Sequence, residues 1–154
     1  MYGKEFRIIE VPVSQAPVGL LLTADPSIDQ LMQYLPGCRC FTGQAGAEIY
    51  GVIAVEPIGG NRLEIKNLAV AEQHQKKGYA RQLINYVISL AASSGYKILV
   101  VKTCHTSLPA LQLYQKAGFR ITRKEENYFI SHYPEPIYEH GRRCLHRLTL
   151  ELPL

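Results

Sequence analysis

The sequence of 154 residues predicts a single domain, residues 1–154, of the α/β (α+β) class, in which a mixed sheet carries helices on its faces. Segments rich in β-forming residues and separated by glycine turns fill residues 38–71, which is typical of antiparallel strands. Apolar residues then recur at helical spacing over residues 77–94. A nearly continuous apolar run follows at 96–103, as expected for a strand buried on both faces. The chain is long enough to enclose one hydrophobic core.

The first elements are a strand, a leucine-rich stretch and a helix. Residues 6–13 mix Ile, Val and Phe with polar side chains and predict a strand. Residues 17–23 are rich in leucine. Asp25 is expected to cap a helix whose first position is Pro26, because a carboxylate accepts from free amides and proline suits the first turn. That helix is expected to stop at the Pro-Gly pair at 36–37.

Three consecutive antiparallel strands are expected next. The segments 38–42 and 48–57 are separated by the turn-forming residues 43–46, so we expect them to form a hairpin. A second turn at 58–61 leads into a third strand at 62–71. Because short turns join neighbouring strands antiparallel, these segments predict a meander.

The second half of the chain alternates strands and helices. The helix at 77–94 is expected to end at Gly95, because glycine adopts the left-handed conformation of a C-cap. Ser107 is expected to cap a second helix at 107–117. The remaining segments are a strand at 119–124, an aromatic and proline-punctuated stretch at 127–140, and an alternating strand at 143–152.

Composition excludes several classes of protein. A hydrophobic content of 47% with 19% charged residues excludes a disordered or low-complexity chain. The 17 Lys and Arg residues exceed the 13 Asp and Glu residues, and the net charge of +4 is too small to indicate a nucleic-acid binder. No apolar run approaches the roughly 18 residues of a membrane helix. The N-terminus lacks the pattern of a secretory leader, so a soluble, cytoplasmic protein is expected.

The four cysteines do not form a metal-binding pattern. Cys38 and Cys40 enclose one residue, which resembles half of a metal knuckle, but Cys104 and Cys144 are single. No spaced histidine pair completes a zinc site. Because the cytoplasm keeps thiols reduced, the cysteines are expected to be free thiols that act as small apolar side chains in strands.

The most informative stretch joins the strand at 62–71 to the helix at 77–94. The loop between them has one glycine and two lysines. Free backbone amides at the helix start, the positive end of the helix dipole and the small residue Gly78 together suit a phosphate or pyrophosphate. An ordinary turn with Lys76 and Lys77 in solvent is the alternative. With a single glycine, the loop is neither a Walker loop nor a dinucleotide-binding motif.

Two segments carry a resemblance to a known family. Residues 75–80, Gln-Lys-Lys-Gly-Tyr-Ala, fit the Gln/Arg-x-x-Gly-x-Gly/Ala signature of the GNAT-type N-acetyltransferases. Residues 107–119 resemble that family's Asn-x-x-Ala-x-x-Leu-Tyr-x-x-x-Gly-Phe segment, with Ser107 in place of Asn. The resemblance covers residues 48–119 and fades after Arg123. It implies the GNAT fold, a mixed and mostly antiparallel sheet of six or seven strands with helices on both faces.

The resemblance implies acetyl-coenzyme A (acetyl-CoA) as co-substrate, with no metal. Its pyrophosphate is expected on the backbone amides of residues 75–81, near three basic side chains. Its pantetheine arm is expected to pair with the strand edge at 68–70, where a backbone N–H polarises the acetyl carbonyl. Ser107 serves either the coenzyme contact of the Asn that it replaces or a helix cap. The expected coenzyme-binding residues are Leu68, Ala69, Val70, Gln75, Lys76, Lys77, Gly78, Tyr79, Ala80, Arg81, Ser107 and Ala110.

Acetyl transfer to an amine needs a base for the amine and a proton for the departing thiolate. The resemblance implies that Tyr114 donates the proton, from a phenol of pKa about 10 to a thiolate of pKa about 8.5; a core aromatic is the alternative. Glu64 is the candidate base, and Glu56 is a weaker one. A solvated carboxylate paired with Lys66 or Arg62 is the alternative for Glu64.

Alternation along a strand also places Glu64 and Leu68 on one side, unless a bulge intervenes. Residues 127–140 combine aromatic side chains with carboxylates, which suits a cationic amine, and are expected to form a lid or specificity loop. A loop over the sheet edge or a homodimer contact explains this composition equally well. His105 either lies near the coenzyme or is a polar loop residue.

Together these features predict an N-acetyltransferase that moves acetyl from acetyl-CoA to a primary amine of a small molecule or peptide, by direct attack in a ternary complex. A non-catalytic acyl-CoA sensor on the same fold is the alternative. Neither nucleic acid nor a membrane is expected as a partner.

Overall fold

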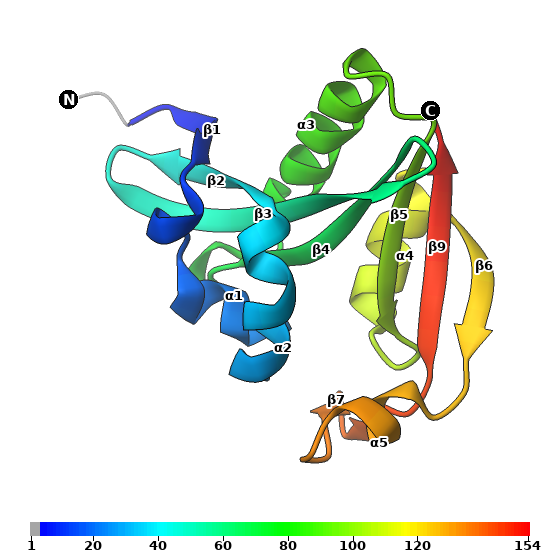
Figure 1. The fold of residues 1–154 in the computed structure, drawn as a ribbon. Coiled ribbons are helices and arrows are strands. Elements are labelled where there is room, and N and C mark those ends of the chain that lie inside the picture. Colours follow the sequence, from blue (N-terminus) through cyan, green and yellow to red (C-terminus); the bar gives the residue numbers. More distant parts are fainter. Residues whose placement is uncertain (1–3) are drawn as a thin grey trace.

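A seven-stranded sheet organises the computed structural model, which describes residues 4–154 (Figure 1). The strand order is β1-β2-β3-β4-β5-β9-β6, and all neighbours are antiparallel except β4 and β5. The mixed, mostly antiparallel sheet is confirmed. Its strands are β1 (Phe6–Val11), β2 (Arg39–Ala45), β3 (Glu48–Gly59), β4 (Arg62–Val70), β5 (Ile98–Cys104), β6 (Arg120–Glu125) and β9 (Arg147–Pro153). A separate two-stranded sheet contains β7 (Tyr138–Glu139) and β8 (Arg142–Arg143).

Helices cover both faces of the large sheet (Figure 1). They are α1 (Val18–Ala24), α2 (Ile28–Tyr34), α3 (Tyr79–Ser93), α4 (Leu108–Lys116) and α5 (Tyr128–His132). Three short 3-10 helices are η1 (Val13–Gln15), η2 (Leu35–Gly37) and η3 (Glu72–His74). Within residues 4–154, no helix has both the length and the apolar character to cross a membrane.

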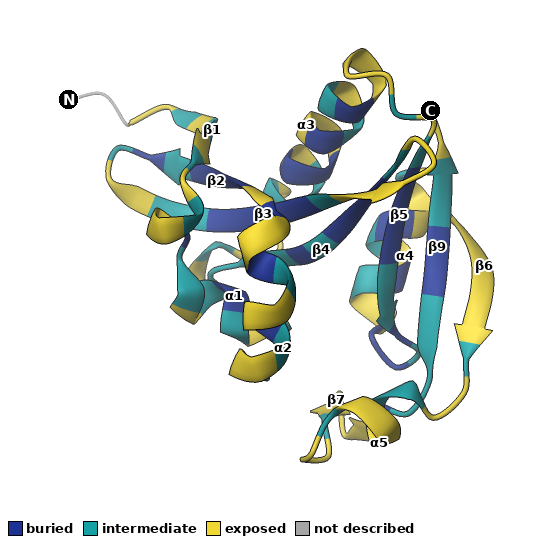
Figure 2. Ribbon diagram, viewed as in Figure 1, coloured by how far each residue is buried: buried dark blue, intermediate teal, exposed yellow. Residues whose placement is uncertain are grey.

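The two faces of the sheet have separate cores (Figure 2). On one face, α3 and α4 bury a cluster that includes Leu83 and Tyr114 against Ile65 and Val101. On the other face, α1 and α2 bury a smaller cluster, which includes Leu21, against β2, β3 and β4. This smaller cluster contains no residue of β5, β9 or β6. The second face of those three strands is therefore not part of a helix-covered core.

β4 and β5 pair at one end and separate at the other (Figure 1). Their parallel pairing runs from Arg62↔Ile98 to Ile65↔Val101 and stops there, although β4 continues to Val70. The edge of β4 beyond Ile65 thus has no β5 partner.

The N-terminus of α2 differs from the prediction. Ser27, not Asp25, is the N-cap, and its Oγ accepts from the backbone N–H of Gln30 at 3.2 Å. Asp25 lies at the C-terminal end of α1, into which the leucine-rich stretch folds. Its carboxylate accepts hydrogen bonds from the hydroxyls of Tyr34 and Tyr133, both at 3.0 Å. These tertiary contacts explain why Asp25 is not used as the cap.

The first hairpin turn lies later than predicted. β2 continues through Ala45, and Gly46 adopts a φ of 61° at the turn. Gly43 lies inside the strand, where a Cβ would come within 2.5 Å of Cζ of Phe6. Glycine is therefore needed at position 43 for close packing rather than for a turn.

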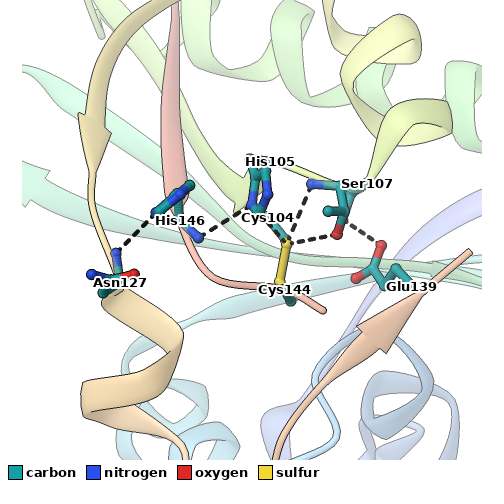
Figure 3. The surroundings of a disulfide bond; sticks show 8 residues. Cys104, His105, Ser107, Asn127, Glu139, Cys144 and His146 are labelled. Atoms are coloured by element: carbon teal, nitrogen blue, oxygen red, sulfur yellow. Dashed lines mark hydrogen bonds between the residues drawn. A yellow bond between two sulfur atoms is a disulfide. The ribbon is translucent and has the colours of Figure 1, made fainter. Parts of the chain in front are cut away.

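The cysteines form two groups. Cys38 and Cys40 are buried free thiols, as expected, and burial raises the pKa of Cys38 to about 12. Cys104 and Cys144 form a disulfide, with Cα atoms 5.8 Å apart (Figure 3). The prediction of free thiols is wrong for this pair. The fold brings together residues 40 positions apart, which spacing along the chain does not reveal.

Candidate functional site

The predicted anion loop runs from the end of β4 to the start of α3. Lys76 and Gly78 both adopt left-handed conformations, with φ values of 61° and 90°. A Cβ on Gly78 would meet no atom within 4 Å, so glycine is needed there for its backbone conformation. Within residues 4–154, no side chain caps α3. Its first amides are therefore free to bind an anion, which the helix dipole also favours.

A cavity of about 230 Å³ lies between this loop and α4. Its wall brings together most of the predicted coenzyme-binding residues: Val70, Gln75, Lys76, Gly78, Tyr79, Ala80 and Arg81. Lys76 and Arg81 therefore both line the cavity at the start of α3, and Nε of Arg81 donates to Oδ1 of Asn85 at 3.2 Å. The predicted residues that do not line this cavity are Leu68, Ala69, Lys77, Ser107 and Ala110.

Three lining residues are not among those predicted from the sequence: His74, Pro109 and Leu113. Pro109 and Leu113 are four positions apart on α4 and so share a helix face. This spacing within residues 107–119 is a sequence signal that could have identified them. His74 stacks on Tyr50 with ring centroids 3.6 Å apart, and its Nε2 lies 2.6 Å from Oε2 of Glu48. Both partners are on β3, so the sequence around His74 gives no signal of these contacts.

The unpaired edge of β4 leads into this cavity. Leu68, Ala69 and Val70 pair with β3 on one side, but no β5 residue pairs with them on the other. Nε2 of Gln75 donates to the carbonyl oxygen of Val70 at 3.0 Å and holds the loop against the strand. The other N–H and C=O groups of this edge suit an extended ligand arm that pairs as an added strand would.

Tyr114 lies in the core between α4 and the sheet. Its ring packs edge-on against Phe119 with centroids 5.3 Å apart, and the residue is 4% exposed. Burial raises the pKa of Tyr114 well above its usual value of 10. The phenol therefore keeps its proton at neutral pH. Tyr114 follows Leu113 of the cavity wall in the sequence but does not itself line the cavity.

Glu64 is buried rather than solvated, with 5% of the residue exposed. Its Oε1 lies 3.2 Å from Nζ of Lys66 and 3.9 Å from Nζ of Lys102. The predicted pairing with Lys66 is thus present, whereas Arg62 pairs with Glu151 instead. Burial between two lysines fixes the position of the carboxylate.

A β-bulge in β4 lies between Glu64 and the free strand edge. Ala54 is opposite Asn67 and Val55 is opposite Ile65, so Lys66 is the extra residue. The alternation changes phase there, and Leu68 packs against the α3 and α4 core. Glu64 precedes the bulge and faces away from that core. Glu64 and Leu68, which would share one side of the strand in the absence of a bulge, therefore lie on opposite sides. Glu64 and Tyr114 consequently lie on opposite faces of the sheet.

Residues 127–140 are held against α1 and α2, on the face of Glu64. The hydroxyl of Tyr133 donates to Asp25 at 3.0 Å. Nε2 of Gln30 donates to the carbonyl oxygen of His132 at 3.1 Å. These contacts join the segment to the C-terminal end of α1 and to α2.

Asn67 extends the same network into the sheet. Its Nδ2 donates to the hydroxyl of Tyr34 at 3.1 Å and to the carbonyl oxygen of Leu21 at 3.0 Å. Its Oδ1 is buried and has no hydrogen-bond partner within residues 4–154. This oxygen is available to an N–H donor.

The C-terminal end of residues 127–140 is held beside the end of β5 (Figure 3). Ser107 is the N-cap residue of α4, as predicted, but its Oγ donates to the carboxylate of Glu139 and makes no capping hydrogen bond to the helix. The backbone N–H of His146 donates to Nδ1 of His105 at 3.2 Å. Burial, followed by the charge of His146, lowers the pKa of His105 below 6.5. His105 belongs to this junction and does not line the cavity at the start of α3.

The chain matches the model of the Acetyltransferase (GNAT) family over residues 10–119. It is 40% identical over 135 residues to the uncharacterized N-acetyltransferase YvbK of Bacillus subtilis, an alignment that covers 88% of this chain and 87% of that protein.

Two solved structures share the whole fold. An IAA acetyltransferase from Bacillus cereus has a TM-score of 0.93 at 35% identity, covering 97% of this chain and 100% of that chain. A GNAT family acetyltransferase from Elizabethkingia anophelis, crystallised with acetyl-CoA bound, has a TM-score of 0.92 at 39% identity, covering 97% and 98% of the two chains. Loop, cavity, strand edge and family model agree, and the chain belongs to the GNAT family of acetyltransferases.

Proposed function

We propose that this protein transfers the acetyl group of acetyl-CoA to a primary amine of a small molecule or peptide, by direct attack in a ternary complex. The observation that carries the proposal is the cavity at the start of α3, because free amides, two basic side chains and an unpaired strand edge meet there. These groups match the three parts of the ligand: phosphates, pantetheine arm and thioester.

The phosphates would be held by the amides of residues 75–81 together with Lys76 and Arg81. The pantetheine arm would lie along residues 68–70, where a backbone N–H would polarise the acetyl carbonyl. Acetyl-CoA would supply the activated acetyl group, and the chain would contribute the orientation and the proton transfers.

Glu64 would act as the base for the amine. An alkylamine has a pKa of about 10.4 and is almost wholly protonated at neutral pH, so removal of its proton must precede attack. Glu64 lies on the face where residues 127–140 and α1 wall the approach. The buried Oδ1 of Asn67 lies on this same face and would accept from the amine as it enters.

Tyr114 would donate its proton to the sulfur as the thioester bond breaks. Burial raises its pKa, so the phenol is protonated at neutral pH but is a weaker acid than a phenol in water. Donation would therefore require the thiolate to form within hydrogen-bond distance of the hydroxyl. A Tyr114→Phe variant is expected to lose activity by about 10²-fold or more while acetyl-CoA affinity stays within about twofold. Tyr86→Phe is the matched control, because Tyr86 lies on the half-exposed side of α3.

Free thiol release measures turnover, and titration calorimetry measures acetyl-CoA affinity. Full activity of Tyr114→Phe removes Tyr114 from the mechanism. Failure of the parent protein to saturate with acetyl-CoA at millimolar concentration contradicts the function itself. Binding without turnover across polyamines, aminoglycosides, amino acids and peptides indicates a sensor instead.

A further inference from the structure

A second cavity, of about 320 Å³, lies on the face of β5, β9 and β6 that α1 and α2 do not cover. It is separate from the coenzyme cavity and shares no lining residue with it. Its lining residues are Ile58, Arg62, Val100, Lys102, Thr122, Arg123, Thr149 and Glu151.

A row of three side chains crosses the centre of this cavity. Thr149 on β9 is opposite Lys102 on β5 and opposite Arg123 on β6, so a hydroxyl lies between two cations. Thr149 is 6% exposed, and its Oγ1 has no hydrogen-bond partner within residues 4–154. Because buried polar groups are nearly always paired, this hydroxyl indicates a missing partner.

The charges around the row are unbalanced. The lining contains three basic residues and one acidic residue, Glu151. Arg62 pairs with Glu151, which leaves Lys102 and Arg123. Lys102 has a single contact with Glu64, at 3.9 Å. Within the described chain, Arg123 forms no ion pair. A Lys, an Arg and a free hydroxyl donor on one wall are the groups that bind an oxyanion.

We propose that this cavity binds a carboxylate or phosphate group, held by Lys102, Arg123 and the hydroxyl of Thr149. Two sources carry such a group: the far end of the acceptor, or a free small anion. The first source rests on the proposed acetyl transfer. Lys102 directly follows the last β5 residue paired with β4, which places the row about 10–12 Å from the free edge of β4. An extended peptide of about three residues spans that distance.

The deciding experiment titrates inorganic phosphate, and separately acetate, into isotope-labelled protein saturated with coenzyme A. Saturation keeps the phosphate probe out of the coenzyme cavity. The amide signals of Arg123 and Thr149 are expected to shift saturably. Arg123→Gln and Thr149→Val should each weaken binding by about tenfold. Lys124→Gln removes the same charge from the neighbouring position on β6, outside the cavity, and should change binding by less than twofold.

Absence of a saturable shift overturns the proposal, and so does equal weakening by Arg123→Gln and Lys124→Gln. Thr149→Val guards against a misfolding artefact, because valine has the same shape and leaves the charges in place. If coenzyme A does not bind, the same titration on the free protein still tests the cavity, and only the proposed function fails.

Acceptor assays then separate the two sources. If the acceptor supplies the anion, triglycine should be acetylated with a lower KM than its C-terminal amide, and Arg123→Gln should remove the difference. If a free anion is bound, acid and amide should have equal KM values, and phosphate should bind without competing with the acceptor.

Discussion

Replacement of Thr149 by valine should stabilise the protein in the absence of anions. The hydroxyl is buried without a partner, and a buried unsatisfied group costs about 1–3 kcal/mol. Valine fills the same space without that cost. Because neighbouring lysine and arginine side chains can adjust, we take the lower end, a gain of about 1 kcal/mol. For a chain of this size the gain raises Tm by about 2–4 °C.

Thr42→Val provides the matched control. Thr42 is also a fully buried strand threonine, but its Oγ1 donates to Oε1 of Gln44 at 3.1 Å. Its replacement removes a hydrogen bond and should cost about 1 kcal/mol. The two substitutions have the same chemistry and opposite expected signs, so hydrophobicity alone cannot explain the result.

Phosphate should reverse the order of stability. At a hundred times its dissociation constant, a ligand that binds only the folded state adds about 2.7 kcal/mol. The parent protein should gain this amount, whereas Thr149→Val, which binds about tenfold more weakly, should gain only about 1.4 kcal/mol. The difference of about 1.3 kcal/mol exceeds the advantage of about 1 kcal/mol in buffer, so the variant that is more stable in buffer becomes slightly less stable in phosphate. Thermal unfolding in both buffers measures the crossover. A loss of stability in Thr149→Val equal to that in Thr42→Val would refute the reasoning.

Two further predictions concern carboxylates. Glu64→Gln should reduce turnover by about 10²-fold or more at neutral pH and recover as pH approaches the amine pKa of about 10.4; Glu56→Gln is the comparison, and a constant loss across pH contradicts a base. Burial alone would raise the pKa of Glu125, but the hydrogen bond from Arg147 and the charges of Arg147, Arg123 and Lys102 together outweigh burial and lower the pKa below 4.5. The pair therefore stabilises the fold above pH 4.5 and less as pH falls through the lowered value. Urea unfolding of Glu125→Gln should show a loss of about 1 kcal/mol at pH 7 that shrinks in acid, whereas the exposed Glu126→Gln should stay within about 0.5 kcal/mol.

The conformation of the loop before α3 could be predicted from sequence because its signals are local. Gly78, the lysines and the helix start lie within a few residues of one another, and each acts through its own backbone or charge. The helix caps were harder to predict because tertiary contacts competed for them. The hydroxyls of Tyr34 and Tyr133 donate to Asp25, and Ser107 donates to Glu139. None of these partners can be recognised from the residues around the cap.

The second cavity could not be predicted because it depends on strand register. Lys102, Thr149 and Arg123 come from three strands and meet only through the pairings of β9 with β5 and β6. A bulge between Ile121 and Arg123 also shifts the register of β6. One residue of slippage would turn Arg123 to the other face, and sequence alone does not locate such a bulge.

The separation of β4 from β5 explains how groups on opposite faces could take part in one reaction. Hydrogen-bonded strands lie about 4.8 Å apart, too close for a thioester to pass between them. Glu64 lies beside the last paired positions, and the free edge at 68–70 begins just beyond them. An amine that approaches on the Glu64 face can therefore meet an acyl group from the α3 and α4 side only in the gap past Ile65. The bulge at Lys66 contributes to this arrangement, because it turns Leu68 toward the α3 and α4 core, the side proposed for the coenzyme, while Glu64 stays on the side proposed for the acceptor.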